Sequence, residues 1–142
     1  MQRGRRIAFD YGDVRIGVAI SDPDSILASP LTTLSNGSPK LFEQILALIT
    51  EHDPVAIYVG EPLNLSGESS SSAEKARAFG QKLNDTFQIP VTMIDERLST
   101  VSATTALRDS GVNAKEVRTR IDMAAAVAIL EQAIRIEKAK NA

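Results

Sequence analysis

The chain has 142 residues, 43% of them hydrophobic and 24% charged, which suits one globular domain with a core of its own. Cysteine is absent, which excludes disulfides, thiolate metal sites and a cysteine nucleophile. The formal net charge of −2 argues mildly against a dedicated nucleic-acid binder, unless several of the acids are gathered at one metal site.

The first quarter of the chain predicts three strands. In residues 5–11, apolar and other side chains alternate, which is the period of a half-buried strand. Gly12 and Asp13 supply turn chemistry, and residues 14–20 form a second apolar run rich in β-branched side chains. The two runs predict a hairpin, and residues 27–34 predict a third, weaker strand.

The middle of the chain predicts helices alternating with short strands. Ser38 and Pro39 resemble an N-cap followed by a first-turn proline, with apolar residues at helical spacing beyond them. Ser71 and Glu74 resemble a capping box at the start of a second amphipathic helix. Short apolar strands are predicted between and after these helices, at residues 55–59 and 91–94.

The last third predicts two helices. The first covers about residues 99–109 and is stopped by Gly111, and the second runs from Asn113 to about Glu137, with Asn113 and Glu116 as a capping pair. A hairpin meander followed by βαβ units predicts an α/β fold with a mixed five-stranded sheet and helices on both faces. No internal repeat is present, so residues 1–142 are predicted to form a single domain.

Acidic residues occupy three unusual positions. Asp10 lies inside a predicted central strand, so its carboxylate is either satisfied by neighbours or bound to a cation. Asp95 and Glu96 end a predicted parallel strand, where ligands gather, although strand-end acids also cap helices. Because adjacent residues point in different directions, only one of them is expected to reach a shared site. Asp122 begins an apolar helical run, and its alternative role is an ion pair with Arg118.

Together these acids predict a metal site. Carboxylate oxygens from separate elements are the ligands that Mg²⁺ or Mn²⁺ prefers, and two such ions can hold the attacking and leaving oxygens of a phosphodiester. The only histidine, His52, lies at a predicted helix end and is interpreted as a solvated or capping residue.

Four ordered segments resemble the YqgF/RuvX family, Holliday-junction-resolvase-like proteins linked to maturation of ribosomal RNA precursors. They are DYGDVRIGVAISD at 10–22, VGEPLNLSG at 59–67, DERLST at 95–100 and DMAAAVAIL at 122–130. The resemblance extends over about residues 5 to 135, which is nearly the whole chain.

The resemblance implies a ribonuclease H-like fold with a carboxylate site. The implied catalytic and metal-binding residues are Asp10, Glu96 and Asp122, with Mg²⁺ or Mn²⁺ as the cofactor. Arg15 and Arg97 match basic family positions, which implies contacts with phosphate oxygens of a nucleic acid.

Glu61 departs from the family pattern, in which an apolar or neutral residue is expected between Gly60 and Pro62. Three roles remain open for it. The extra carboxylate is a further metal ligand, it repels substrate, or it faces solvent.

The leading hypothesis is a metal-dependent nuclease that hydrolyses phosphodiester bonds by a two-metal-ion mechanism. The resemblance implies the 5′ region of the 16S ribosomal RNA precursor as substrate. Three alternatives are a resolvase of Holliday-type DNA junctions, a non-catalytic RNA-binding or transcription-associated factor, and an ATPase of the actin/Hsp70/sugar-kinase type. The ATPase needs two such domains around its nucleotide, and this chain supplies one.

The expected setting is the cytoplasm. The basic opening lacks the apolar core of a secretory signal, and no stretch approaches the roughly 18 apolar residues of a membrane span. No association with a membrane is expected. The nuclease hypothesis implies a nucleic acid as the partner, either precursor rRNA or structured DNA. The protein is expected to be a monomer or a weak homodimer.

Overall fold

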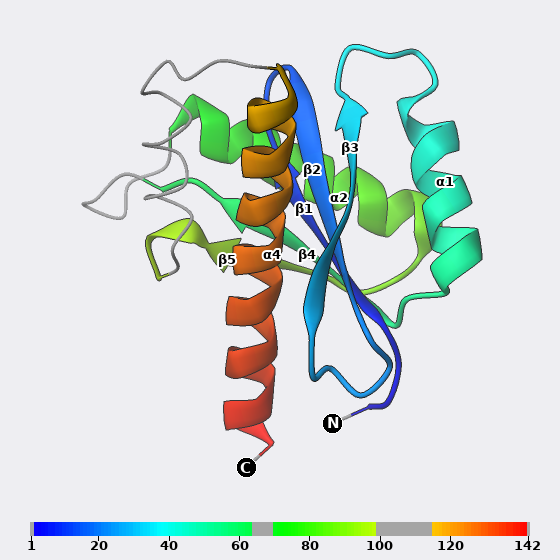
Figure 1. Cartoon of the computed structure of the whole chain (residues 1–142), viewed down its shortest axis with the longest axis vertical. Coiled ribbons are helices and arrows are strands. Elements are labelled where there is room, and N and C mark those ends of the chain that lie inside the picture. The colour runs from blue at the N-terminus through cyan, green and yellow to red at the C-terminus, as the bar shows by residue number, and fades with distance from the viewer. Residues whose placement is uncertain (1, 64–69, 99–114, 142) are drawn as a thin grey trace.

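A five-stranded mixed sheet forms the centre of the structure, a computed structural model that describes residues 2–63, 70–98 and 115–141 (Figure 1). The strands are β1 (Arg6–Tyr11), β2 (Arg15–Ser21), β3 (Ala28–Ser35), β4 (Ala56–Glu61) and β5 (Val91–Asp95). Their order is β3-β2-β1-β4-β5, with antiparallel β1–β2 and β2–β3 pairs and parallel β1–β4 and β4–β5 pairs. The predicted mixed sheet is confirmed.

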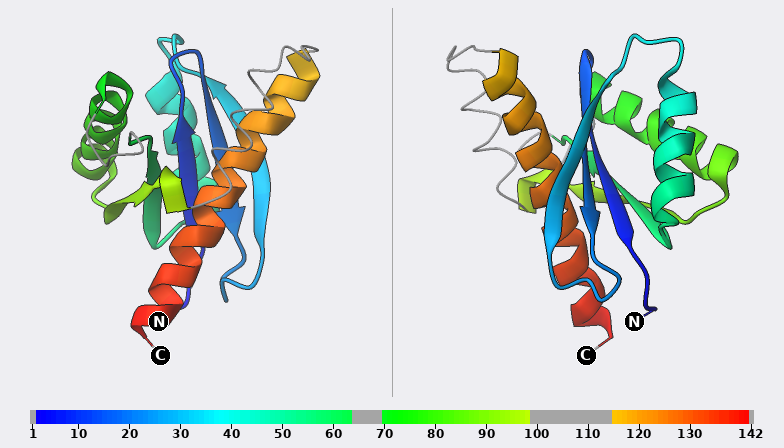
Figure 2. Two further views of the ribbon diagram at one scale, coloured as in Figure 1. Left: turned by 90° about the vertical axis from the view of Figure 1, so that its left-hand side faces the viewer. Right: turned by 45° about the vertical axis from the view of Figure 1, so that its right-hand side comes forward.

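Helices cover both faces of this sheet, as predicted (Figure 2). Helices α1 (Leu41–His52) and α2 (Ser71–Phe87) lie on one face, and α4 (Lys115–Lys140) crosses the other. Strand alternation decides which core each residue joins: Ile7 and Phe9 of β1 pack toward α1 and α2, while Ala8 packs against α4. Small residues such as Ala8 and Ala19 allow α4 to lie close to the strands.

Both predicted helix starts need correction. Helix α1 begins at Leu41 with no side-chain cap, because the Ser38 hydroxyl instead accepts the Lys40 N–H in a local turn. Helix α2 is capped by Ser70, whose hydroxyl accepts the Ala73 N–H, so the predicted Ser71 capping box is displaced by one residue. The buried side chains of α2 form one stripe, as predicted, and include Ala76, Phe79 and Leu83.

The end of the chain is confirmed in part. The predicted final helix is α4, which continues past Glu137 to Lys140. The helix predicted at 99–109, and Asn113 of the predicted capping pair, lie outside the described residues. Within the described ranges, no helix has the length and hydrophobicity needed to cross a membrane.

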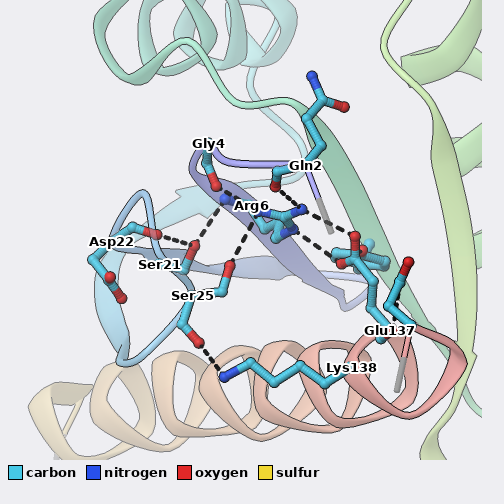
Figure 3. Close-up of polar contacts among 10 residues, drawn as sticks. Gln2, Gly4, Arg6, Ser21, Asp22, Ser25, Glu137 and Lys138 are labelled. Atoms are coloured by element: carbon cyan, nitrogen blue, oxygen red, sulfur yellow. Dashed lines mark hydrogen bonds and ion pairs between the residues drawn. The ribbon is translucent and has the colours of Figure 1, made fainter.

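A buried arginine fastens the C-terminal half of α4 to the sheet (Figure 3). Arg6 of β1 is 1% exposed, and its Nε and Nη2 each lie 3.0 Å from a carboxylate oxygen of Glu137. Tyr58 of β4 donates to the same carboxylate at 2.8 Å, and burial raises the pKa of Tyr58 to about 12, so the phenol remains a donor. The cluster therefore ties β1 and β4 to α4.

Loss of the Glu137 charge is expected to destabilise the protein in a pH-dependent way. The hydrogen bond from Arg6 is the main reason that the pKa of Glu137 lies below its ordinary value. This stabilisation is present above the unfolded-state pKa of about 4.3 and is lost as pH falls through the lower folded-state pKa. Glu137→Gln should lower the free energy of unfolding by about 2 kcal/mol at pH 7, since it leaves Arg6 buried without its counter-charge.

Urea unfolding of parent and variant at several pH values measures this effect. The difference between them should shrink as pH falls below about 4. Glu131→Gln, an exposed change on the same helix, is the control and should have no such effect. A difference that stays constant down to the acid limit would contradict the assigned role of the carboxylate.

Candidate active site

Asp10 lies near the end of the central strand β1 and is 8% exposed. Its side chain shares a strand face with Ala8, which packs against α4. Its partner in the antiparallel ladder is Gly17 of β2. The carboxylate thus occupies the α4 face of the sheet, where a charged group needs polar neighbours or a cation.

Glu96 reaches toward the same region from the other side. It follows β5 directly and begins the short 3-10 helix η1 (Glu96–Leu98). A Cβ atom at Gly60 of β4 would lie 2.5 Å from Glu96 Oε1, so the absence of a side chain there gives the carboxylate its space over β4. Asp10 and Glu96 line one cavity of about 230 Å³.

Asp122 enters from α4 and is 3% exposed. A Cβ atom at Gly17 would collide with the main-chain oxygen of Asp122, so the helix approaches β2 at the strand partner of Asp10. The Asp122 carboxylate accepts a hydrogen bond of 2.7 Å from Arg15 Nε. The predicted alternative was an ion pair between Asp122 and Arg118, but the side chain of Arg118 is not among those described. The ion pair that the structure describes for Asp122 is the one with Arg15.

The structure brings the three acids to one region without joining them as a metal centre. Among the described residues, no three histidine, aspartate or glutamate side chains are arranged to hold a metal ion. Asp10 and Glu96 share the cavity, while Asp122 contacts Arg15 beside it. The metal site formed by the three acids therefore stays a prediction.

Asp95 faces away from this cavity. Its carboxylate lies 2.6 Å from Arg97 Nη2 and also accepts the Arg97 main-chain N–H at 3.0 Å. The hydrogen bond from the Arg97 side chain is the main cause that holds the pKa of Asp95 below its usual range. Of the two strand-end acids, Glu96 is the one that lines the cavity. The predicted phosphate-binding residues Arg15 and Arg97 are thus each paired with an acid, Asp122 and Asp95 respectively.

Glu61 belongs to the opposite side of the sheet. Alternation in β4 puts it on the face of Val59, which packs toward α2, rather than on the face of Gly60. Its Oε2 lies 2.9 Å from Arg77 Nη1 of α2. This geometry favours an ion pair between β4 and α2 over a metal ligand.

Removal of the Glu61 carboxylate is therefore expected to leave catalysis nearly intact. Glu61→Leu should keep the rate of substrate cleavage within about threefold of the parent, because a partly exposed ion pair contributes about 0–1 kcal/mol. Glu61→Gln, which keeps the shape, is the matched control, and single-turnover rates are the measurement. A loss of about a hundredfold or more would make Glu61 part of the site.

Helix α2 contributes to the site in a way that was not predicted from the sequence. Ser72, in its first turn, lines the same cavity as Asp10 and Glu96. The N-terminus of a helix carries partial positive charge and unsatisfied N–H groups, which favour a phosphate. The signal was available, because serines that start a helix after a parallel strand lie at the ligand-binding edge of the sheet.

Comparison with known proteins gives two consistent results. Residues 4–136 match the family model described as "RuvX: Holliday junction resolvase". A relative from Streptomyces avermitilis is 45% identical over 140 residues, covering 97% of this chain and 90% of its own. Another, from Rhodococcus erythropolis, is 47% identical over 135 residues, covering 91% and 76%. Both carry the name "Putative pre-16S rRNA nuclease".

Solved structures show the fold. The RuvC protein of Thermus thermophilus in complex with a Holliday junction substrate aligns with a TM-score of 0.59 at 16% identity, covering 94% of this chain and 96% of that one. A second Thermus thermophilus RuvC structure aligns with a TM-score of 0.57, also at 16% identity, covering 95% and 96%. The sheet and helices described above are therefore those of the ribonuclease H-like fold.

Proposed function

The chain belongs to the RuvX family, and from this premise we propose that it is a nuclease that hydrolyses phosphodiester bonds of the 16S ribosomal RNA precursor. The observation that carries the proposal is the shared cavity of Asp10 and Glu96, two acids at the ends of strands β1 and β5. The names of the relatives supply the substrate class. A ribosomal RNA substrate would place the protein in the cytoplasm, and we further propose that it acts as a monomer or weak homodimer.

The donor set fits Mg²⁺ or Mn²⁺. Asp10, Glu96 and Asp122 supply only carboxylate oxygens, which these hard cations prefer. In this proposal the three residues would hold two ions, and Asp122 would have to give up its contact with Arg15 to reach one of them. When bound, the ions would supply positive charge that stabilises the attacking and leaving oxygens of the phosphodiester.

The remaining residues bind and orient the substrate. Ser72 in the first turn of α2 lines the cavity, and the partial positive charge of this helix N-terminus would attract the phosphate. Arg15 and Arg97 are about one-third exposed, at 29% and 32% of their side chains, and can turn toward flanking phosphates.

One cleavage experiment tests this function. The purified chain is incubated with a 5′-extended 16S precursor RNA and with a four-way DNA junction, each with Mg²⁺, Mn²⁺ or EDTA. We expect metal-dependent cleavage of the RNA. Cleavage of the junction alone would favour the second candidate, a DNA resolvase, which the family description supports. RNA binding without cleavage under any condition would indicate a non-catalytic RNA-binding factor.

A further inference from the structure

A second, larger cavity of about 530 Å³ lies between α1 and α2, on the face of the sheet opposite α4. Its lining includes three aromatic side chains and two lysines, namely Tyr11, Phe42, Phe79, Lys75 and Lys82. Among the described residues that line it, none is acidic. Lys75 is paired with the exposed Asp13 at 3.3 Å, while Lys82 lies over the Phe42 ring, so a phosphate would compete with Asp13 for Lys75.

This cavity neighbours the carboxylate cavity, and the two share Tyr11 in their linings. Ser72 lines the carboxylate cavity, while Lys75, Phe79 and Lys82 line the larger one. These four residues are three or four positions apart, which places them on one face of the helix. Tyr11, next to Asp10, lines both cavities.

The chemistry of the lining suits a nucleotide. Phe79 is 6% exposed and packs against Tyr11 and Phe42, which are partly buried and offer the ring surface of the cavity. The Lys82 ammonium lies 4.3 Å from the centroid of the Phe42 ring. Aromatic rings of this kind stack with unpaired bases of any sequence, and lysines pair with the phosphates between them. A base that takes the place of the Lys82 ammonium over Phe42 leaves that ammonium available for a phosphate.

We propose that the cavity between α1 and α2 binds an unpaired nucleotide of the substrate strand, next to the phosphodiester that is cleaved at Asp10 and Glu96. This subsite rests on the proposed nuclease function. A paired base has both faces buried in its own stack, so the subsite selects single-stranded substrate at this position. The subsite therefore predicts that the enzyme cleaves a phosphodiester that has an unpaired nucleotide next to it.

Binding measurements that require no cleavage test the subsite. A fluorescein-labelled single-stranded RNA of about eight nucleotides and a duplex of the same length are titrated with the chain in EDTA, and anisotropy is recorded at several salt concentrations. Phe42→Leu should weaken single-strand binding about tenfold, since stacking on one ring is worth roughly that much. Lys75→Gln combined with Lys82→Gln should reduce the single-strand salt slope by about 1.4, or about 0.7 for each lost contact.

Control variants distinguish a local subsite from a general loss of affinity or of structure. Lys140→Gln, an exposed lysine at the end of α4, should leave single-strand affinity unchanged, and every variant should bind the duplex as the parent does. The two exposed lysine changes do not disturb the core, so they test the proposal even if Phe42→Leu is poorly folded. Quenching of 2-aminopurine in the RNA, lost in Phe42→Leu, reports the stacked base directly.

Three outcomes would overturn the subsite. Unchanged single-strand binding in both variants, with precursor cleavage intact, removes the subsite and leaves the proposed nuclease function standing. An equal loss of duplex and single-strand binding shows a general effect on structure. A concentration-dependent dimer of the parent that Phe42→Leu abolishes, with RNA binding unchanged, assigns the cavity to a second copy of the chain. If the parent neither binds nor cleaves RNA, the proposed function itself fails.

Discussion

Asp10→Asn is expected to reduce phosphodiester cleavage at least a thousandfold, which corresponds to about 4 kcal/mol of transition-state stabilisation. The change removes a nearly buried charge at the centre of the carboxylate site and keeps the shape of the side chain. Nucleic-acid affinity should stay within about threefold of the parent, because most of it comes from phosphate contacts elsewhere. Single-turnover cleavage and anisotropy binding measure the two quantities separately.

The same variant tests the metal site in the absence of substrate. A ligand that binds only the folded protein adds about 2.7 kcal/mol to its stability at a hundred times its Kd. Mn²⁺ should therefore raise the melting temperature of the parent and have little effect on Asp10→Asn. Asp85→Asn, an exposed change on α2, is the control and should respond as the parent does. Full cleavage by Asp10→Asn would remove Asp10 from the reaction.

Gly17→Ala is expected to be the most disruptive single-methyl change on the α4 face. The added Cβ would overlap the main-chain oxygen of Asp122, and a main-chain atom cannot rotate out of the way as a side chain does. The helix would have to shift away from β2, at a cost of about 3 kcal/mol in the free energy of unfolding, the upper end of what overpacking usually costs. Cleavage should fall as well, because the shift separates Asp122 from Asp10.

Gly37→Ala is the matched control for this prediction, because a Cβ there meets no atom within 4 Å among the described residues. Urea unfolding of the two variants gives the comparison directly. Equal stabilities would show that α4 does not rest on β2 at this glycine, and the proposed approach of Asp122 to Asp10 would then have to be abandoned.

Much of the fold could be predicted from local patterns of apolar and polar residues in the sequence. Alternation in β1 identified which of its side chains share a face, the apolar run at residues 14–20 identified β2, and the alternation of helices with later strands identified the parallel half of the sheet. These periods are intrinsic to strands and helices, so they can be recognised in the sequence without knowing which elements pack together. The unusual position of Asp10 was visible for the same reason, since a carboxylate interrupts an otherwise apolar strand.

The choice of cap depended on more than local sequence. Ser38, Ser70 and Ser71 all have the chemistry of a helix cap, and only Ser70 serves as one. Local chemistry therefore supplies several candidates, and it does not fix which of them lies at the point where the backbone enters the helix.

The sequence by itself determined the order of the described strands and helices and the alternation of side chains in β1. It also predicted that Asp95 and Glu96 follow a parallel strand, as they do. The tertiary structure alone decided the partners of the charged groups. Asp122 contacts Arg15, 107 residues away, and Arg6 contacts Glu137, 131 residues away. The periodicity of a sequence indicates on which face of its own strand or helix a residue lies. An ion pair depends in addition on which elements pack together and in what register. That register is set by the whole core, at contacts such as Gly17 with the backbone of α4.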